Sequence, residues 1–393
     1  MAAGGDHTCA TTATGALFCW GDNDLNQIGD GSGGLQPTAL TTSESLKRIA
    51  AGERHTCGIK TSGNLVCWGA NEHAQLGLVT SPEAADVPAP TAFMGETLTD
   101  LALGARHGCA IAETGAAFCW GANDAGQLGS STAATDGTPN QVGQGQDWLV
   151  LTAGSAHTCG VRAVGAGGGS LWCWGDNTNG QVGQGQPEHG VDAERPKQVG
   201  RDTTWVDVSA GRAHTCAIRL DSTLWCWGDN QSGQVAAAAD VASLHVPERV
   251  GEQLGWEAVA AGGDSTCGVR AGALYCWGRI VDSRVPTTLG ASATWQAVSV
   301  GSAAARPHMC AVSGDTLACM GDNRHGQLGT GSRLKQPAPT AIGQADWAIL
   351  ALGSAHSCAL RRDGVVLCWG ADDAGQRGDG TTDVPAPVRL AEP

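Results

Sequence analysis

The stretch that decides the fold is residues 52–69, which read GERHTCGIKTSGNLVCWG. Its two cysteines, Cys57 and Cys67, are ten residues apart, so a symmetric hairpin that pairs them centres on Ser62. The three-residue loop then ends at Gly63, and glycine suits the left-handed last position of such a loop. Directly opposed residues in a hairpin have Cα atoms ~4.5–5.5 Å apart, which is within reach of a disulfide. The stretch therefore predicts a short antiparallel hairpin that can be closed by one cysteine pair.

The same pattern recurs eight times, with its first cysteine at residues 9, 57, 109, 159, 216, 267, 310 and 358. After Cys-Trp-Gly each copy continues into a loop such as 176–183, a Pro-x-x-Val run such as 196–199, and a lead segment such as 205–211. Four short runs with β-branched or aromatic residues, separated by Gly, Pro and Asn, indicate a four-stranded antiparallel sheet. Radial repetition of such sheets is the layout of a β-propeller. We predict an all-β propeller of eight blades, the alternative being seven blades plus an extra repeat.

The repeat also predicts the domain organisation, because it overrides the two or three domains that length alone would suggest. We expect residues 1–393 to form a single domain. The first copy begins at Ala3-Gly4 without a lead strand, and the last copy ends with Pro385-Ala-Pro-Val388. Ring closure removes open sheet edges, so we expect one blade to take strands from both ends of the chain. We also expect a native upstream sequence, including a signal peptide, to precede this chain.

The pattern Gly-x-x-His-Thr-Cys followed by Leu-x-Cys-Trp-Gly resembles the regulator of chromosome condensation repeat family, in its bacterial, cysteine-bearing form. The resemblance covers essentially the whole chain and implies a β-propeller. It implies much less about function, because that family includes exchange factors, photoreceptors, enzyme inhibitors and scaffolds.

All 16 cysteines belong to the repeat, and the spacing within a copy is ten residues in five copies, nine in two and fourteen in one. In every copy the loop length keeps the two cysteines opposite one another. We predict eight disulfides and hence an extracellular or periplasmic location, with reduced buried thiols and zinc binding as alternatives. Zinc is disfavoured because Ser265 replaces the repeat histidine in the sixth copy. The predicted pairs are Cys9–Cys19, Cys57–Cys67, Cys109–Cys119, Cys159–Cys173, Cys216–Cys226, Cys267–Cys276, Cys310–Cys319 and Cys358–Cys368.

The repeated histidines and tryptophans favour a structural role. A catalytic residue is one special group, whereas these side chains recur at one position in copy after copy. We expect each histidine to hydrogen-bond the backbone of a neighbouring blade and each tryptophan to pack between blades. The sequence contains no phosphate loop, paired catalytic carboxylates or zinc-protease motif. We therefore predict no catalytic residue, no metal and no cofactor.

Composition narrows the function classes. Lys plus Arg number 23 against 38 Asp plus Glu, and the net charge of −15 argues against coating nucleic acid or an anionic membrane. No stretch approaches the ~18 apolar residues of a membrane-spanning helix. We expect a secreted bacterial scaffold, not an enzyme, that binds a protein or carbohydrate partner as a monomer without nucleic acid or membrane insertion. The alternatives are an enzyme or enzyme-inhibitor module of a larger secreted protein, and a purely structural domain.

In a propeller built from repeated sheets, the features that distinguish one copy from another are expected in the connecting loops. The loops of the fourth and fifth copies, 186–195 and 236–245, are longer than most. They combine apolar and acidic residues, and an apolar centre with a charged rim is typical of recognition patches. We predict a partner-binding patch there, the alternative being tolerated surface insertions. Its predicted members are Glu188, Val191, Asp192, Glu194, Asp240, Val241 and Leu244.

Overall fold

The structure is a computed structural model that describes residues 1–11, 17–21, 38–40, 46–77, 85–90, 96–130, 135–165, 167–185, 192–290, 294–344, 347–361, 366–371 and 384–389. Within these ranges every extended element is a β-strand, no helix occurs, and neighbouring strands are antiparallel. The all-β prediction is confirmed. None of the described segments forms a helix long and apolar enough to cross a membrane.

The repeat copies are numbered here as units 1 to 8, each with four strands. Units 1 and 2 comprise β1 (Ala2–Ala3), β2 (His7–Thr11), β3 (Leu17–Gly21), β4 (Thr38–Leu40), β5 (Leu46–Ala51), β6 (His55–Lys60), β7 (Leu65–Gly69) and β8 (Ala85–Pro90). Units 3 and 4 comprise β9 (Leu98–Leu103), β10 (His107–Ala112), β11 (Ala116–Ala122), β12 (Thr135–Gln146), β13 (Trp148–Ala153), β14 (His157–Ala163), β15 (Gly169–Gly175) and β16 (Ala193–Gln198). Units 5 and 6 comprise β17 (Trp205–Ala210), β18 (His214–Arg219), β19 (Leu224–Asp229), β20 (Ser243–Arg249), β21 (Trp256–Gly262), β22 (Ser265–Arg270), β23 (Ala273–Gly278) and β24 (Ser283–Leu289). Units 7 and 8 comprise β25 (Ala297–Val300), β26 (His308–Ser313), β27 (Thr316–Gly321), β28 (Gln336–Gln344), β29 (Trp347–Leu352), β30 (His356–Arg361), β31 (Val366–Gly370) and β32 (Val384–Arg389).

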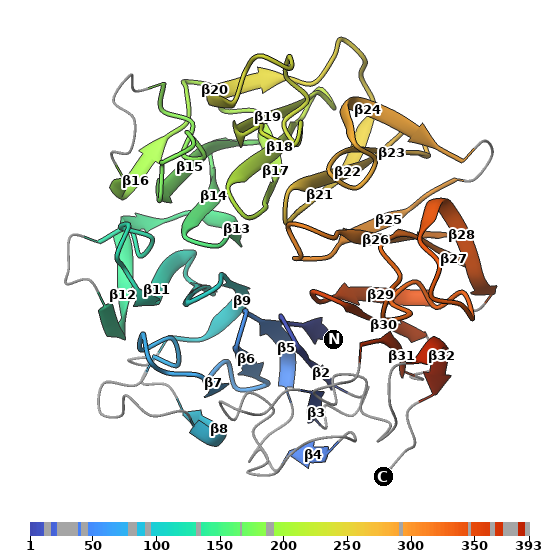
Figure 1. Cartoon of the computed structure of the whole chain (residues 1–393). Coiled ribbons are helices and arrows are strands. Elements are labelled where there is room, and N and C mark those ends of the chain that lie inside the picture. The colour runs from blue at the N-terminus through green and yellow to red at the C-terminus, as the bar shows by residue number, and fades with distance from the viewer. Residues whose placement is uncertain are drawn as a thin grey trace.

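The units are arranged radially as a β-propeller, with the first strand of each unit nearest the centre and the fourth at the rim (Figure 1). The described strands form six four-stranded sheets and one eight-stranded sheet. The large sheet holds units 4 and 5, which join where Gly169 pairs with Trp205. In each unit the second and third strands form the predicted hairpin, and the two cysteines face each other in registers such as Cys57↔Cys67.

The ring closes differently from the sequence expectation. Unit 1 has its own short lead strand, because Ala2 and Ala3 pair with Cys9 and Thr8. The last sheet is completed by β32, which pairs with β31 of the same unit. The prediction of one blade shared by both chain ends is therefore wrong for the described strands. Closure instead comes from packing unit 8 against unit 1, where the Ser354 amide donates to the Gly5 carbonyl at 3.0 Å.

The core lies between units as well as within them. Trp174, which follows the second cysteine of unit 4, is fully buried and shares one hydrophobic cluster with Leu128 of the preceding unit. Its ring also meets the ring of Trp148 edge-on, with centroids 5.5 Å apart. A small set of large aromatic side chains thus provides much of the apolar contact between neighbouring sheets, as the sequence predicts.

Candidate functional site

The eight hairpins each carry the predicted disulfide. The Cα atoms of the paired cysteines are 4.1–4.2 Å apart, and every cysteine is 0–1% exposed. The disulfide prediction is confirmed for all eight pairs, so the cysteines hold neither zinc nor free thiols in this structure. Loop chemistry follows the prediction as well, since Gly63 and Gly115 have φ angles of +89° and +81° at the left-handed loop position.

A ring of buried histidines ties the units together. In six junctions the histidine of one unit contacts, through Nε2, the hydroxyl at the Thr position of the next unit, at 2.6–3.0 Å. The partner is thus a side-chain hydroxyl, whereas the sequence predicted a backbone group. The pairs are His7–Thr56, His107–Thr158, His157–Thr215, His214–Thr266, His308–Ser357 and His356–Thr8. The last of these closes the ring.

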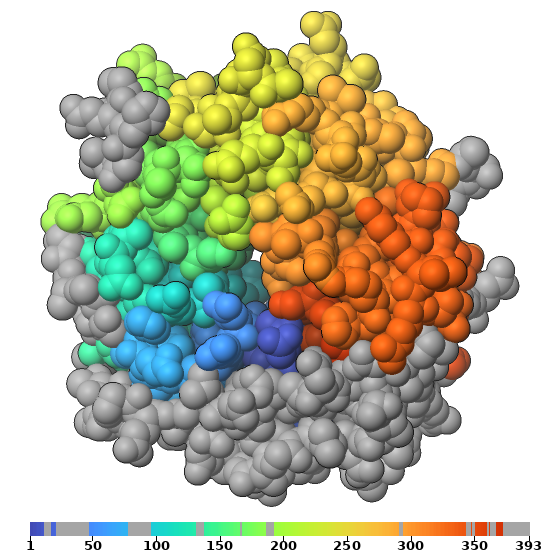
Figure 2. Space-filling view, viewed as in Figure 1, coloured from blue at the N-terminus to red at the C-terminus, as the bar shows by residue number. Residues whose placement is uncertain are grey.

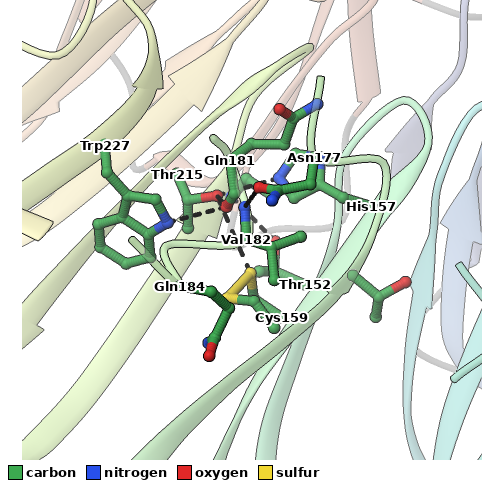
Figure 3. The surroundings of a disulfide bond; sticks show 12 residues. Thr152, His157, Cys159, Asn177, Gln181, Val182, Gln184, Thr215 and Trp227 are labelled. Atoms are coloured by element: carbon green, nitrogen blue, oxygen red, sulfur yellow. Dashed lines mark hydrogen bonds between the residues drawn. A yellow bond between two sulfur atoms is a disulfide. The ribbon is translucent and has the colours of Figure 1, made fainter. Parts of the chain in front are cut away.

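The hydroxyl is one part of a larger junction, seen between units 4 and 5 (Figure 3). The Thr215 hydroxyl donates to the Gln181 carbonyl at 3.0 Å, and Trp227 Nε1 donates to the same oxygen at 2.8 Å. Gln181 is presented by a tight loop in which Asn177 Oδ1 accepts from the Val182 amide at 3.2 Å. The Asn and Gln of the loop motif therefore position one carbonyl that receives two donors from the next unit.

These contacts determine the protonation of the histidines. Because Thr215 donates its proton to Gln181, it accepts from His157, whose ring hydrogen therefore lies on Nε2. His157 Nδ1 lies against Gly154 and has no hydrogen-bond partner within the described residues. Burial lowers the pKa of each shifted ring histidine, and neighbouring ring histidines lower the pKa of His55 further. The pKa falls to about 3 for His55, His107, His214 and His356 and to about 4 for His157 and His308.

Removing one junction hydroxyl tests this arrangement. We expect Thr215→Val to lower the free energy of unfolding by about 2–3 kcal/mol, because the buried His157 N–H loses its acceptor while the side-chain volume is retained. Urea unfolding followed by tryptophan fluorescence measures the change. The matched control Thr203→Val alters an exposed threonine and should stay within about 0.5 kcal/mol of the native chain. Equal losses in the two variants would contradict a role for the Thr215 hydroxyl.

The centre of the ring is hollowed (Figure 2) into a cavity of about 320 Å³ lined mainly by glycine and alanine. A Cβ on Gly52 would lie 2.6 Å from the Gly104 carbonyl oxygen and 2.3 Å from His55 Cε1, so the close approach of units requires glycine there. Glu53 and Arg212 are the charged residues among the described lining, and Arg212 Nε is paired with Asp264 at 2.8 Å. Ser155, Ser302 and Ser354 are the hydroxyl-bearing residues of the described lining, which contains no histidine or cysteine.

The described members of the predicted partner-binding patch do not lie together on one surface in the structure. Glu188 and Val191 lie outside the described residues. Asp192 accepts a hydrogen bond from the Asn177 amide at 3.1 Å, which gives it a role in holding a loop. Val241 and Leu244 are half-buried and pack against the hydrophobic core. The remaining predicted members, Glu194 and Asp240, are exposed. Glu194 stands against Gly126 of unit 3, whereas Leu244 stands against Gly180 of unit 4, so they belong to different junctions.

The most irregular junction is the one between units 6 and 7. Unit 6 connects β23 to β24 through residues 279–282 alone, so it lacks the loop that presents a Gln carbonyl elsewhere. In unit 7 the two donors to that carbonyl are replaced by Met309 and Met320, which are buried in one cluster with Ile280. Ser265 occupies the position at which the other units carry the ring histidine, so no histidine needs a hydroxyl partner from unit 7. Its Oγ accepts from the Ile280 amide at 3.1 Å. These substitutions together replace a polar junction by an apolar one.

The missing loop leaves a cavity of about 600 Å³ between units 5, 6 and 7. One side is formed by the segment before β26, where extra residues including Arg306-Pro307 separate Gly301 from His308. The charged residues of the cavity lining are Arg279, Asp282, Arg284, Arg306, Asp322 and Lys335. The short turn of unit 6 and the extra residues of unit 7 are each visible in the sequence, but the sequence did not predict that they meet at one cavity. Within the described part of the chain no group of three or more His, Cys, Asp and Glu side chains could hold a metal ion.

Comparisons with known proteins agree with the repeat. A family model described as regulator of chromosome condensation (RCC1) repeat matches residues 1–27, 46–75, 98–127, 205–234 and 348–376. A second model with the same description matches residues 168–218. The chain therefore contains RCC1 repeats.

Relatives share the repeat at low identity. The human E3 ubiquitin-protein ligase HERC2 is 25% identical over 297 residues, which is 73% of this chain and 5% of that protein. This chain thus spans only a small part of that relative's length. Among solved structures, human WBSCR16 has a TM-score of 0.71 at 19% identity and covers 86% of this chain and 96% of its own. Prp20p of Saccharomyces cerevisiae has a TM-score of 0.69 at 21% identity, covering 88% of this chain and 91% of its own. These structures support the propeller fold.

Proposed function

We propose that this chain is a non-enzymatic scaffold that binds a protein partner through its solvent-facing irregular segments. One contrast carries the proposal. The repeated polar groups of the interior are used in contacts between units, as at Thr215 and Gln181. The large cavity between units 5, 6 and 7 opens where the repeat departs from its pattern, and none of its cations forms an ion pair within the described residues. Uniform contacts build a framework, whereas departures from the pattern can distinguish one partner from another.

Related propellers support a protein as the partner class. Prp20p has described binding properties toward Gsp1p and histones, and yeast RCC1 (Prp20) has been crystallised with Kap60 bound to it. Because these chains are about one fifth identical to this one, they carry no specific partner over to it. We keep a carbohydrate as the alternative ligand class, and exclude nucleic acid from the proposal because the net charge is −15.

The proposal includes eight blades and an oxidising compartment. Each of the eight disulfide hairpins lies within its own set of four strands, which supports eight blades over seven plus an extra repeat. Eight disulfides support an extracellular or periplasmic location, since reducing compartments keep thiols free. A bacterial source and a monomeric single domain belong to the same proposal.

A capture experiment tests the function. The disulfide-intact chain is immobilised and exposed to the secreted and cell-surface proteins of its source organism, and each retained protein is then titrated by biolayer interferometry. We expect at least one protein to bind the native chain and not the reduced, alkylated chain. Neither the bound protein nor the native chain should be chemically changed by the binding. The variant Glu194→Ala/Asp240→Ala tests the exposed members of the patch around units 4 and 5, whose apolar members pack inward. Absence of any selectively retained protein, or turnover of the retained one, would overturn the proposal.

A further inference from the structure

We propose that the cavity between units 5, 6 and 7 binds an acidic, extended segment of a partner protein. This inference rests on the proposed scaffold function and names the chemistry that the scaffold recognises. The cavity of about 600 Å³ has the size of sites that hold small molecules or several side chains. Its walls come from the loop after β19, the short turn 279–282 with the start of β24, the segment before β26 and the connection between β27 and β28.

The lining gathers an excess of positive charge, with four cations against two carboxylates. Arg279 Nε donates to the Ala305 carbonyl at 3.0 Å, and the Arg284 guanidinium donates to the Asn230 and Gln231 carbonyls at 2.9 and 3.0 Å. Carbonyl partners orient a guanidinium without neutralising it, so both side chains keep a full charge at the cavity. Each is therefore held in place yet available to a carboxylate.

Two further cations are free. Arg306 and Lys335 are exposed and make no hydrogen bond or ion pair with any described residue. Of the two acids in the lining, Asp322 is already engaged, because its Oδ1 pairs with Arg324 Nε at 3.0 Å and its Oδ2 accepts from Gln327 Nε2 at 2.9 Å. Asp282 is the remaining carboxylate. Four cations around one opening are notable in a chain with only 23 Lys plus Arg against 38 Asp plus Glu.

The surroundings favour a peptide over a polyanion. The cavity lining also contains the apolar residues Ile280, Ala305 and Pro307. Apolar side chains beside cations match a segment that alternates acidic and apolar residues. A nucleic acid or sulfated glycan would bring its charges far beyond the cavity and meet an acidic surface, since the chain carries −15 overall. The observations therefore favour an acidic protein segment.

Fluorescence anisotropy with a labelled octapeptide of glutamate and leucine tests the site. The charge-reversal variant Arg306→Glu/Lys335→Glu changes two exposed side chains without protein partners, so the fold should be retained. The matched control Lys197→Glu/Arg201→Glu makes the same charge change at exposed positions of unit 4 and the following segment. We expect at least a tenfold (~1.4 kcal/mol) loss of affinity in the first variant and less than about a threefold loss in the control.

Three results would overturn the assignment. They are equal affinity of both variants, equal binding of the peptide with glutamine in place of glutamate, and tighter binding of a heparin fragment or single-stranded DNA than of the acidic peptide. Binding of the natural partner found in the capture experiment distinguishes a failure of the cavity assignment from a failure of the scaffold function on which it rests. Undiminished retention of that partner by Arg306→Glu/Lys335→Glu overturns the cavity assignment and leaves the scaffold function standing. Failure of the native chain to retain any protein overturns the scaffold function itself.

Discussion

Acidification from pH 7 to pH 4 is expected to unfold the ring while its disulfides remain intact. Six buried histidines have a pKa of about 3 or 4 in the folded chain, whereas an unfolded chain binds these protons near pH 6.5. Above pH 6.5 these histidines are neutral in both states and do not affect the stability. As the pH falls from 6.5 toward 3, the unfolded chain takes up protons that the folded chain does not, so the free energy of unfolding decreases. Each pKa unit corresponds to about 1.4 kcal/mol, and pH 4 lies about 2.5 units below 6.5, so at pH 4 the six sites together disfavour folding by on the order of 20 kcal/mol. That exceeds the whole stability of a typical domain.

Near-ultraviolet circular dichroism and thermal melting between pH 7 and pH 3 measure this loss. The variant His55→Leu removes the one ring histidine that has no hydroxyl partner, because Gly108 occupies the corresponding position in unit 3. We expect the pH dependence of its stability between pH 6 and pH 4.5 to weaken by about one proton, or ~1.4 kcal/mol per pH unit. His73→Gln, in a loop, serves as the control and should leave the profile unchanged. A melting temperature equal at pH 7 and pH 4 would show that the histidine ring does not limit stability.

Complete reduction of the disulfides should unfold the protein at neutral pH. A bridge that closes a loop of about ten residues stabilises by at most about 2–3 kcal/mol, chiefly by restricting the unfolded chain. Eight such bridges together exceed the usual stability of about 5–15 kcal/mol. The sulfurs are buried, so we expect reduction to be slow in buffer and much faster at moderate urea concentrations, where hairpins open.

Mass spectrometry after alkylation follows the number of opened bridges, and tryptophan fluorescence follows the fold. Intact mass before and after reduction should differ by two hydrogens for each of the eight bridges. A chain with all 16 cysteines alkylated that kept its native fluorescence and melting temperature would contradict this expectation. It would also remove the main argument for an oxidising compartment.

The sequence was sufficient to predict the hairpins, their cysteine register and the propeller, because these depend on local spacing. Loop residues such as Gly63 and Gly115 set the hairpin length, and that length places the two cysteines opposite each other. The periodicity also predicted the buried tryptophans correctly. The closing blade was predicted wrongly because a two-residue strand, Ala2–Ala3, is too short to leave a recognisable pattern.

The contacts between units could not be read from one copy of the repeat. His157 meets Thr215 across 58 positions of sequence, and only the stacking of neighbouring units reveals which groups face each other. The cavity was missed for the same reason. Ser265, Met309 and Met320 are single departures in sequence, and they become one connected change only when units 6 and 7 lie side by side. A missing Gln-x-Gly loop in the copy that precedes Met309 was the available signal.

The two junctions without a histidine–hydroxyl bond lie opposite each other in the ring. One is between units 2 and 3, where Gly108 occupies the repeat position of the hydroxyl that His55 lacks, and the other is between units 6 and 7, where Ser265 replaces the histidine and Met309 replaces the hydroxyl residue. They divide the propeller into two half-rings of four units, each fastened by three such bonds. The first seam keeps the bond from Trp120 Nε1 to the Gln75 carbonyl at 2.9 Å, and the second has no equivalent among the described residues. The two half-rings are thus joined on one side by an indole–carbonyl hydrogen bond and on the other, beside the basic cavity, by the apolar packing of Met309, Met320 and Ile280.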